Sequence, residues 1–200
     1  MPKHKHDEKP HKHKREHHPK HGDLDAEHLN GIVQAYNFSP KGGVEGLLLT
    51  EGDRTVQVNI PSDASLMAAH AAAVGQAVQI TASPEGHPVP DAEHPVYRLI
   101  SFEPSNGTGA AVDGPSHEGI VSVEGIVSRF NYARHGEPNG VVLDNGDFLH
   151  LKPDGMKKAG LRVGQEVAAE GRARPMALGH RVIEVEVVDR VALGPKRSFP

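Results

Sequence analysis

The sequence has no cysteine and no tryptophan, and aromatic residues make up only 4% of it. Without cysteine the chain has no disulfide, no thiolate nucleophile and no zinc site built on cysteine. Its longest apolar runs are far shorter than the ~20 residues that span a bilayer, and no apolar segment follows the charged N-terminal residues. These absences predict no transmembrane helix, no secretory signal and no membrane partner, so the cytoplasm is the expected location.

The charge of the chain is unevenly distributed. Residues 1–22 contain seven Lys/Arg and three Asp/Glu, whereas the remaining residues contain 15 and 23. The N-terminal segment is therefore basic, and the body of the protein is acidic. An acidic body disfavours non-specific binding of a phosphate backbone, so any such binding depends on the N-terminal segment or on a local patch.

The basic segment, residues 1–23, is also rich in histidine and has no aliphatic side chain after Met1. Such a segment buries too little apolar surface to offset its ordering entropy, so we expect a disordered arm. Neutral imidazole binds zinc, nickel and copper, and the His-x-His pairs suit a chain that wraps an ion. The arm predicts binding of Zn or Ni, while a solvated basic tail or an affinity tag remain alternatives. The candidate ligands are His4, His6, His11, His13, His17, His18 and His21.

An internal repeat organises the rest of the chain. Residues 31–53 align without a gap with residues 125–147, and the two segments share nine identities, among them Asn37 with Asn131. The order of the matched blocks is kept further along the chain. A duplication of one module explains this pattern.

Each copy has five segments of alternating or β-rich sequence. In the first copy a helix is predicted over 63–75, with Asp63 as N-cap and Gly75 as stop. In the second copy a shorter helix is predicted over 154–159, and Asn145-Gly146 predicts a hairpin turn between strands two and three. The predicted strands are 31–38, 44–50, 55–60, 76–82 and 96–102 in the first copy, and 120–132, 139–144, 147–152, 164–172 and 180–191 in the second.

Five strands with a helix between the third and fourth resemble an OB barrel, and the repeat is similar to tandem OB-like repeats of uncharacterised bacterial proteins. The expected fold class is all-β, with one short helix per repeat and two tandem five-stranded OB-like barrels. Other small barrels, such as SH3-like ones, are the rival folds. The expected domains are the arm 1–23, repeat 1 at 24–104, a flexible linker 105–117 that lets the barrels tumble partly independently, repeat 2 at 118–193 and a tail 194–200.

Strand three separates core from surface in both copies. Matching the alternation pairs Val56 with Leu149 and Val58 with Leu151, which places Thr55/Gln57/Asn59 and Phe148/His150/Lys152 on the outer faces. OB barrels bind ligands along strands two and three and the adjoining loops, and an aromatic beside cations suits base stacking. The alternative is that Phe148 packs beneath a loop. The expected ligand-binding residues in repeat 2 are Arg129, Asn131, Arg134, Phe148, His150 and Lys152.

Four aromatic residues of the first strands, Tyr36, Phe38, Phe130 and Tyr132, alternate in register with Ile32 and Ile126. The spacing predicts that all six side chains share one face, which we interpret as barrel core. His87 and His94 lie in a proline-rich loop, for which a metal site is the alternative to a solvated loop.

No phosphate loop, nucleophile elbow or metalloprotease motif is present, so we expect a binding protein without catalytic residues or a required cofactor. Two hypotheses remain. The first is a tandem OB protein that binds single-stranded nucleic acid weakly through repeat 2. The second is a metal-handling protein, in which the arm holds divalent ions and the barrels are a scaffold or dock a protein partner.

Overall fold

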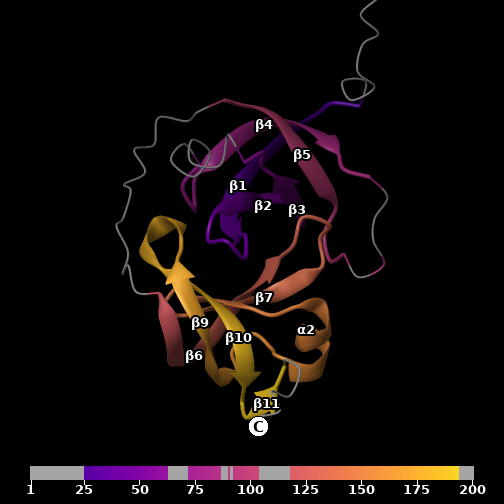
Figure 1. Cartoon of the computed structure of the whole chain (residues 1–200). Coiled ribbons are helices and arrows are strands. Elements are labelled where there is room, and N and C mark those ends of the chain that lie inside the picture. The colour runs from indigo at the N-terminus through magenta and orange to yellow at the C-terminus, as the bar shows by residue number, and fades with distance from the viewer. Residues whose placement is uncertain (1–24, 63–71, 87–89, 91, 104–117, 194–200) are drawn as a thin grey trace, which may run out of the picture.

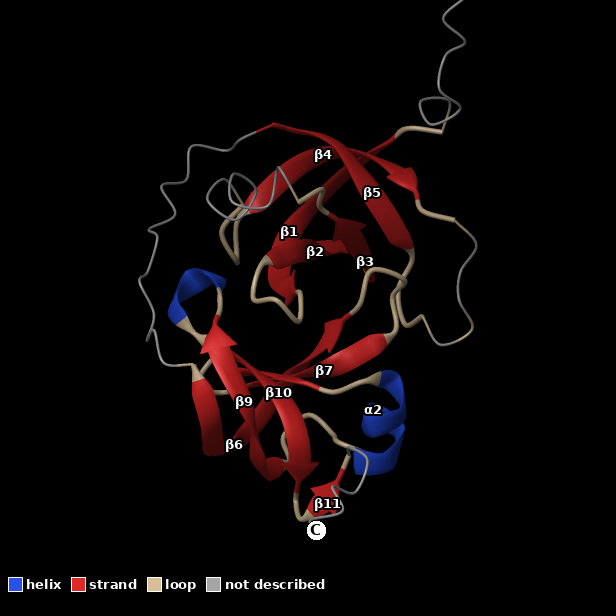
Figure 2. Cartoon of the chain, in the orientation of Figure 1, coloured by secondary structure: helices blue, strands red, loops and turns tan. Residues whose placement is uncertain are grey.

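The computed structural model describes residues 25–62, 72–86, 90, 92–103 and 118–193, which form two β-barrels, one above the other in the view of Figure 1. Strands account for most of the regular structure, as Figure 2 shows. No helix of the described residues is long and apolar enough to cross a membrane. Residues 63–71 of the helix predicted at 63–75 lie outside the described residues, as do the whole of the linker 105–117, the arm and the C-terminal tail.

The first barrel closes in the order β1-β2-β3-β5-β4, with β4 paired to β1. The third and fifth strands are parallel, and the other neighbours are antiparallel. This order is that of an OB barrel. The strands are β1 (Glu27–Phe38), β2 (Val44–Glu51), β3 (Arg54–Asn59), β4 (Ala77–Pro84) and β5 (Val96–Glu103).

The second barrel repeats the same order as β6-β7-β8-β10-β9, with β8 and β10 parallel and β9 paired to both β6 and β10. The helix α2 (Pro153–Ala159) follows the third strand, as the sequence predicts, and Gly160 ends it in a left-handed conformation. The all-β, two-barrel prediction is therefore confirmed. The elements are β6 (Gly119–Tyr132), β7 (Pro138–Leu143), β8 (Phe148–His150), β9 (Glu166–Pro175), a 3-10 turn η1 (Ala177–Gly179), β10 (Arg181–Val188) and β11 (Val191–Ala192).

Matching β-bulges change the facing of the first strand in both repeats. The pairing of β1 with β2 shifts between Val33 and Ala35, and that of β6 with β7 shifts at the equivalent place, between Val127 and Arg129. One extra residue turns the following side chains over. The prediction that Ile32 and Ile126 share the core face was therefore wrong: they are 51% and 47% exposed. Val33 and Val127 fill the two cores instead, while the tyrosines and Phe38 are buried and Phe130 is half-buried.

The strand-three register also differs in detail from the prediction. Leu47 pairs with Val58, whereas Val141, its equivalent in the repeat, pairs with Leu149. Leu149 therefore corresponds to Val58 rather than to Val56, because the second hairpin is shorter. The predicted assignment of these residues to the inner and outer faces of the third strands still holds. Val56, Val58, Leu149 and Leu151 all lie in the barrel cores, and Phe148 points out of its own barrel.

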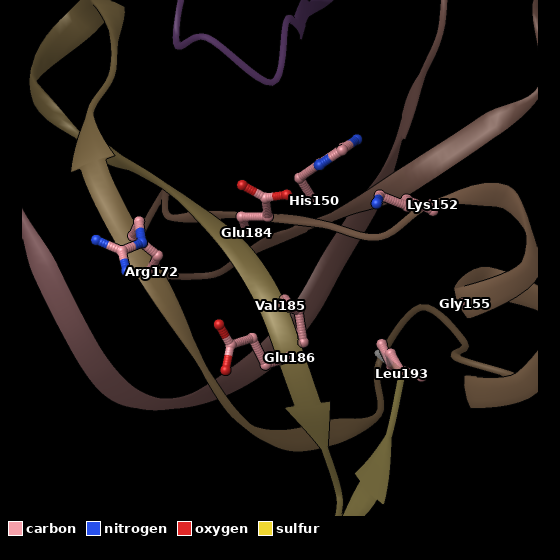
Figure 3. A pocket seen from close by; sticks show the side chains of 8 residues that line it. All are labelled: His150, Lys152, Gly155, Arg172, Glu184, Val185, Glu186 and Leu193. Atoms are coloured by element: carbon pink, nitrogen blue, oxygen red, sulfur yellow. The ribbon is translucent and has the colours of Figure 1, made fainter. Parts of the chain in front are cut away.

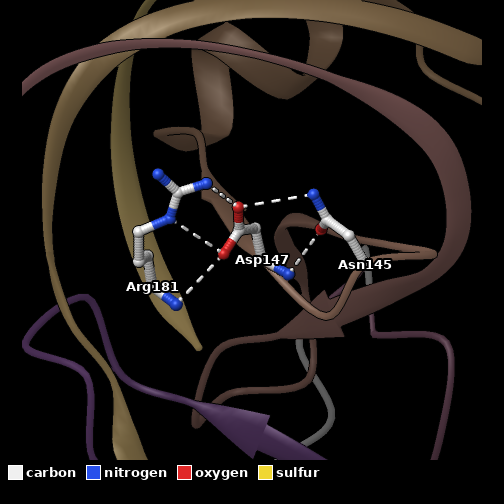
Figure 4. A network of polar contacts seen from close by, with 3 residues as sticks. All are labelled: Asn145, Asp147 and Arg181. Carbon is white, nitrogen blue, oxygen red and sulfur yellow. Dashed lines mark hydrogen bonds and ion pairs between the residues drawn. The ribbon is translucent and has the colours of Figure 1, made fainter. Parts of the chain in front are cut away.

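A polar network fixes that shorter hairpin (Figure 4). Asn145 and Gly146 form the predicted turn between β7 and β8. The backbone N–H of Asp147 donates to the Asn145 side chain at 2.9 Å, and the buried Asp147 carboxylate forms an ion pair with Arg181 at the start of β10. The Arg181 backbone N–H also donates to this carboxylate at 3.1 Å. The network therefore holds the turn against the fifth strand and sets the position of β8.

The two barrels are docked against each other, so the expectation that they tumble partly independently was wrong. One buried apolar cluster combines residues of the first barrel with Val142, Phe148, Met176 and Val182 of the second. Backbone hydrogen bonds join the loops as well, since the Ala177 N–H donates to the Gly42 carbonyl at 2.7 Å. The barrels therefore form one packed unit across this interface.

Candidate functional site

The structure places the six ligand-binding residues expected in repeat 2 at three separate locations. Arg129, Asn131 and Phe148 are covered by the first barrel. His150 and Lys152 lie on the outer surface of the second barrel and line a hollow. Arg134 is exposed at the rim between the barrels, where its guanidinium donates to the Ile60 carbonyl at 3.4 Å. The six residues therefore do not form one groove.

Phe148 does not stack on a ligand in this arrangement, because no part of its side chain is exposed. Its ring lies 6.3 Å from that of Phe38 in the first barrel and 5.9 Å from the His150 ring. Gly140 makes room for it: a Cβ there would approach Phe148 Cε2 to 2.7 Å. The predicted outward direction was right, but the first barrel covers that face, so the expected exposure was wrong.

Asn131 is fully buried and binds across the interface. It accepts from the Phe38 N–H at 2.8 Å, and its amide donates to the Phe38 carbonyl at 3.0 Å and to Asn139 at 2.7 Å. Asn37, its equivalent in the repeat, accepts from the Tyr132 N–H at a longer 3.4 Å. The shared asparagine of the repeat thus marks a pseudo-twofold contact between the barrels rather than a ligand site.

Arg129 also connects the barrels. Its guanidinium donates to the Tyr36 carbonyl at 2.7 Å and to the Phe130 carbonyl at 3.0 Å, and it lies 5.7 Å from the centre of the Phe38 ring. Burial lowers the pKa of Arg129 to about 10. The side chain remains charged at neutral pH, yet no carboxylate among the described residues pairs with it.

The interface covers the surfaces that OB barrels commonly use for ligands, namely strands two and three with their adjoining loops. From β3, Gln57 donates to the Ala133 carbonyl at 2.8 Å and Asn59 donates to the Arg134 carbonyl at 2.7 Å. From the second barrel, Phe148 and Met176 join the cluster of the first. Much of each barrel's customary binding surface is therefore occupied by the other barrel.

Away from this interface, repeat 2 has an outer hollow, about 220 Å³ in volume, between β8, β9, β10 and the start of α2 (Figure 3). Half-buried His150 lies beside Glu184 on the neighbouring strand, with Lys152 and Arg172 on either side. Among the described residues neither Lys152 nor Arg172 has an ion-pair partner. The hollow thus presents two exposed cations around an imidazole.

The charges of the hollow are mixed. Burial is the main cause that lowers the pKa of His150, and Lys152 and Arg174 lower it further, against the opposing effect of Glu184. The imidazole is therefore neutral at pH 7. Glu184 pairs with Arg174 at 3.6 Å, and Glu186 also lines the hollow. The hollow is a local cationic rim on a barrel of nearly balanced charge, with ten Lys/Arg and 11 Asp/Glu over 118–192, and not a continuous basic groove.

Sequence reasoning missed Arg172 and Glu184. They come from β9 and β10, which the barrel brings beside β8 although they are more than twenty residues away in the sequence. A signal was available on β9, where Arg172 and Arg174 are separated by one buried alanine. That alternation marks an outward cationic face.

The described residues hold no group of three or more His, Asp and Glu side chains placed to bind a metal ion. The seven histidines of the arm, and His87, lie outside those residues. His94 is described, and its ring packs edge-on against Tyr132 at 4.9 Å. The described His94 therefore packs against Tyr132 and belongs to no such group of three or more metal-ligating side chains.

Comparison with protein families and with curated proteins finds no match. Among solved structures, the chain is similar to the wild-type single-stranded DNA binding protein from Thermus aquaticus, with 17% identity, a TM-score of 0.32, and coverage of 88% of this chain and 97% of that one. A deletion mutant of the same protein matches at 16% identity and a TM-score of 0.32, with the same coverage. Likeness at this level assigns no ligand to the present chain.

Proposed function

We propose that the chain is a non-catalytic tandem OB protein that binds single-stranded nucleic acid weakly, through phosphate contacts at the outer hollow of repeat 2. The observation that supports this is the pair of exposed cations, Lys152 and Arg172, that flank His150 without ion-pair partners among the described residues. The basic arm supplies the long-range attraction that the acidic body lacks. Base stacking on Phe148 has no part in this proposal.

The test is a fluorescence titration of a labelled oligothymidine of about 16 nucleotides against full-length protein at several salt concentrations. A cation that meets one phosphate of a single strand contributes about 0.7 to the salt slope. We therefore expect Lys152→Ala and Arg172→Ala each to weaken binding modestly and to reduce the slope by about 0.7. The matched control is Lys158→Ala, which removes an exposed cation of α2 outside the hollow and should change neither quantity.

Deletion of residues 1–22 is expected to weaken binding further, because it removes a net positive charge from an otherwise acidic chain. If that deletion abolishes binding while Lys152→Ala and Arg172→Ala leave both affinity and slope unchanged, only the arm touches the oligonucleotide. The hollow would then have no role in nucleic-acid binding.

The second candidate function is metal handling by the arm, with the docked barrels as scaffold or protein-docking surface. Seven histidines in the arm and the mutual covering of the two OB faces favour it. Calorimetry with Zn²⁺ and Ni²⁺ on the full chain and on a chain beginning at Asp23 tests it. Binding should be tighter near pH 7.5 than near pH 5.5, because imidazole with a pKa of about 6.5 is largely protonated at the lower pH. Equal metal uptake by both chains would place the ions on the barrels.

A further inference from the structure

A second hollow, about 390 Å³ in volume, lies between the two barrels on the side of β1 and β6. Residues of both repeats line it, and they include one cation, one histidine and several apolar side chains. The lining includes Leu48, His94, Ser128, Arg129, Phe130 and Tyr132. A volume of this size at a domain interface is typical of small-molecule sites. We call it the inter-barrel cleft.

The cation of the cleft has no counter-charge. Arg129 is mostly buried, and its bonds go to two backbone carbonyls, so at least one of its N–H groups has no acceptor among the described residues. Buried cations are ordinarily paired, since an isolated charge in a low dielectric is costly. The lowered pKa of Arg129 is the signature of burial without compensation by an acid. An oxyanion in the cleft would supply the missing partner.

None of the other residues that line the cleft is an acid: they are neutral polar and apolar side chains. Leu48 and Tyr132 are buried, and Phe130 packs against them. Glu93, which precedes His94 in the chain, does not line the cleft and accepts a hydrogen bond from the Tyr132 hydroxyl at 2.7 Å. Burial lowers the pKa of His94, so its ring is neutral at pH 7 and offers one N–H donor without charge. The cleft therefore combines one unpaired guanidinium with an aromatic and aliphatic wall.

We propose that the inter-barrel cleft binds a small organic oxyanion, with a carboxylate or phosphate head on Arg129 and a planar apolar body against Leu48, Phe130 and Tyr132. The planar guanidinium accepts both kinds of head group in a bidentate manner, so the shared chemistry is the oxyanion. The site requires both repeats in their docked arrangement. It is separate from the outer hollow and does not depend on the proposed nucleic-acid binding.

The test is to titrate the full-length protein with benzoate, phenyl phosphate, benzyl alcohol and inorganic phosphate. Binding is measured by calorimetry and by amide chemical shifts. Benzoate and phenyl phosphate are expected to bind and to shift the amides around the cleft. Benzyl alcohol, which lacks charge, and inorganic phosphate, which lacks the ring, should each bind at least ten-fold more weakly. The stronger of the two aromatic anions identifies which head group the cleft prefers.

Two variants separate binding from structure. Arg129→Met should weaken binding of the aromatic anions at least ten-fold. Ser128→Phe places a ring into the cleft from an exposed position, and it should weaken their binding equally while the hydrogen bonds of Arg129 stay in place. Lys152→Ala, in the outer hollow, should leave the affinities unchanged. The proposal is overturned if neither aromatic anion binds, or if Ser128→Phe and Arg129→Met both leave the affinities within two-fold of the parent protein.

Discussion

Replacing Phe148 by alanine is expected to lower the free energy of unfolding by about 3–5 kcal/mol, the usual cost of removing a buried phenylalanine. The ring is fully buried and lies in the apolar cluster that joins the barrels, against Phe38. Gly140 leaves no side chain that could move into the vacated volume. Urea denaturation followed by circular dichroism measures the change.

The control for this prediction is Ile120→Ala, which truncates a side chain that is 64% exposed on β6 and should change stability by less than about 0.5 kcal/mol. The same Phe148→Ala protein also tests whether this ring stacks on a base. A variant that kept full stability but bound oligonucleotide less tightly would show that Phe148 is exposed in solution and that the barrels are not docked as described.

Asn131→Ala is expected to cost roughly 3 kcal/mol or more, because it leaves three buried polar groups without their partner and each such group costs about 1–3 kcal/mol. These groups are the N–H and carbonyl of Phe38 and the side-chain oxygen of Asn139. The same urea titration measures this destabilisation. Part of it should appear as separation of the barrels, visible as increased hydrogen exchange at the Phe38 amide.

The repeat itself provides the matched control, Asn37→Ala. Asn37 makes one longer bond, to the Tyr132 N–H, and its amide nitrogen is buried without a partner. Removing it should therefore change stability by only about 1 kcal/mol or less, since removal of a weak bond is offset by removal of an unsatisfied donor. Equal effects of the two substitutions would contradict the asymmetric interface.

The strands and their order could be predicted because alternation and turn residues are local signals. The duplication strengthened each assignment, since two independent segments had to fit one pattern. The bulges at Gln34 and Ser128 could not be predicted, because the extra residue in each has no distinctive local sequence. They reverse the facing of the residues around them, and this is why Ile32 and Ile126 are exposed rather than buried.

The site was harder to predict than the fold for a different reason. The outward direction of Phe148 follows from strand alternation, but what covers an outward face depends on a partner about one hundred residues away in the chain. Arg172 joins Lys152 only through the order of strands in the closed sheet. The alternation of residues within one β-strand shows neither what covers its outer face nor which strands lie beside it. It therefore predicts a groove where the structure has an interface and a hollow.

The docking of the barrels through Asn131 and Phe148 has a consequence for how the duplication is retained. Because both partners belong to one polypeptide, each barrel meets the other at an effective concentration on the order of millimolar, whatever the amount of protein in the cell. An interface too weak to hold two separate chains together at cellular levels is sufficient under that condition. Fusion of the two copies thus relaxes selection on interface affinity, which allows Asn37 to bind the opposite barrel less tightly than Asn131 does.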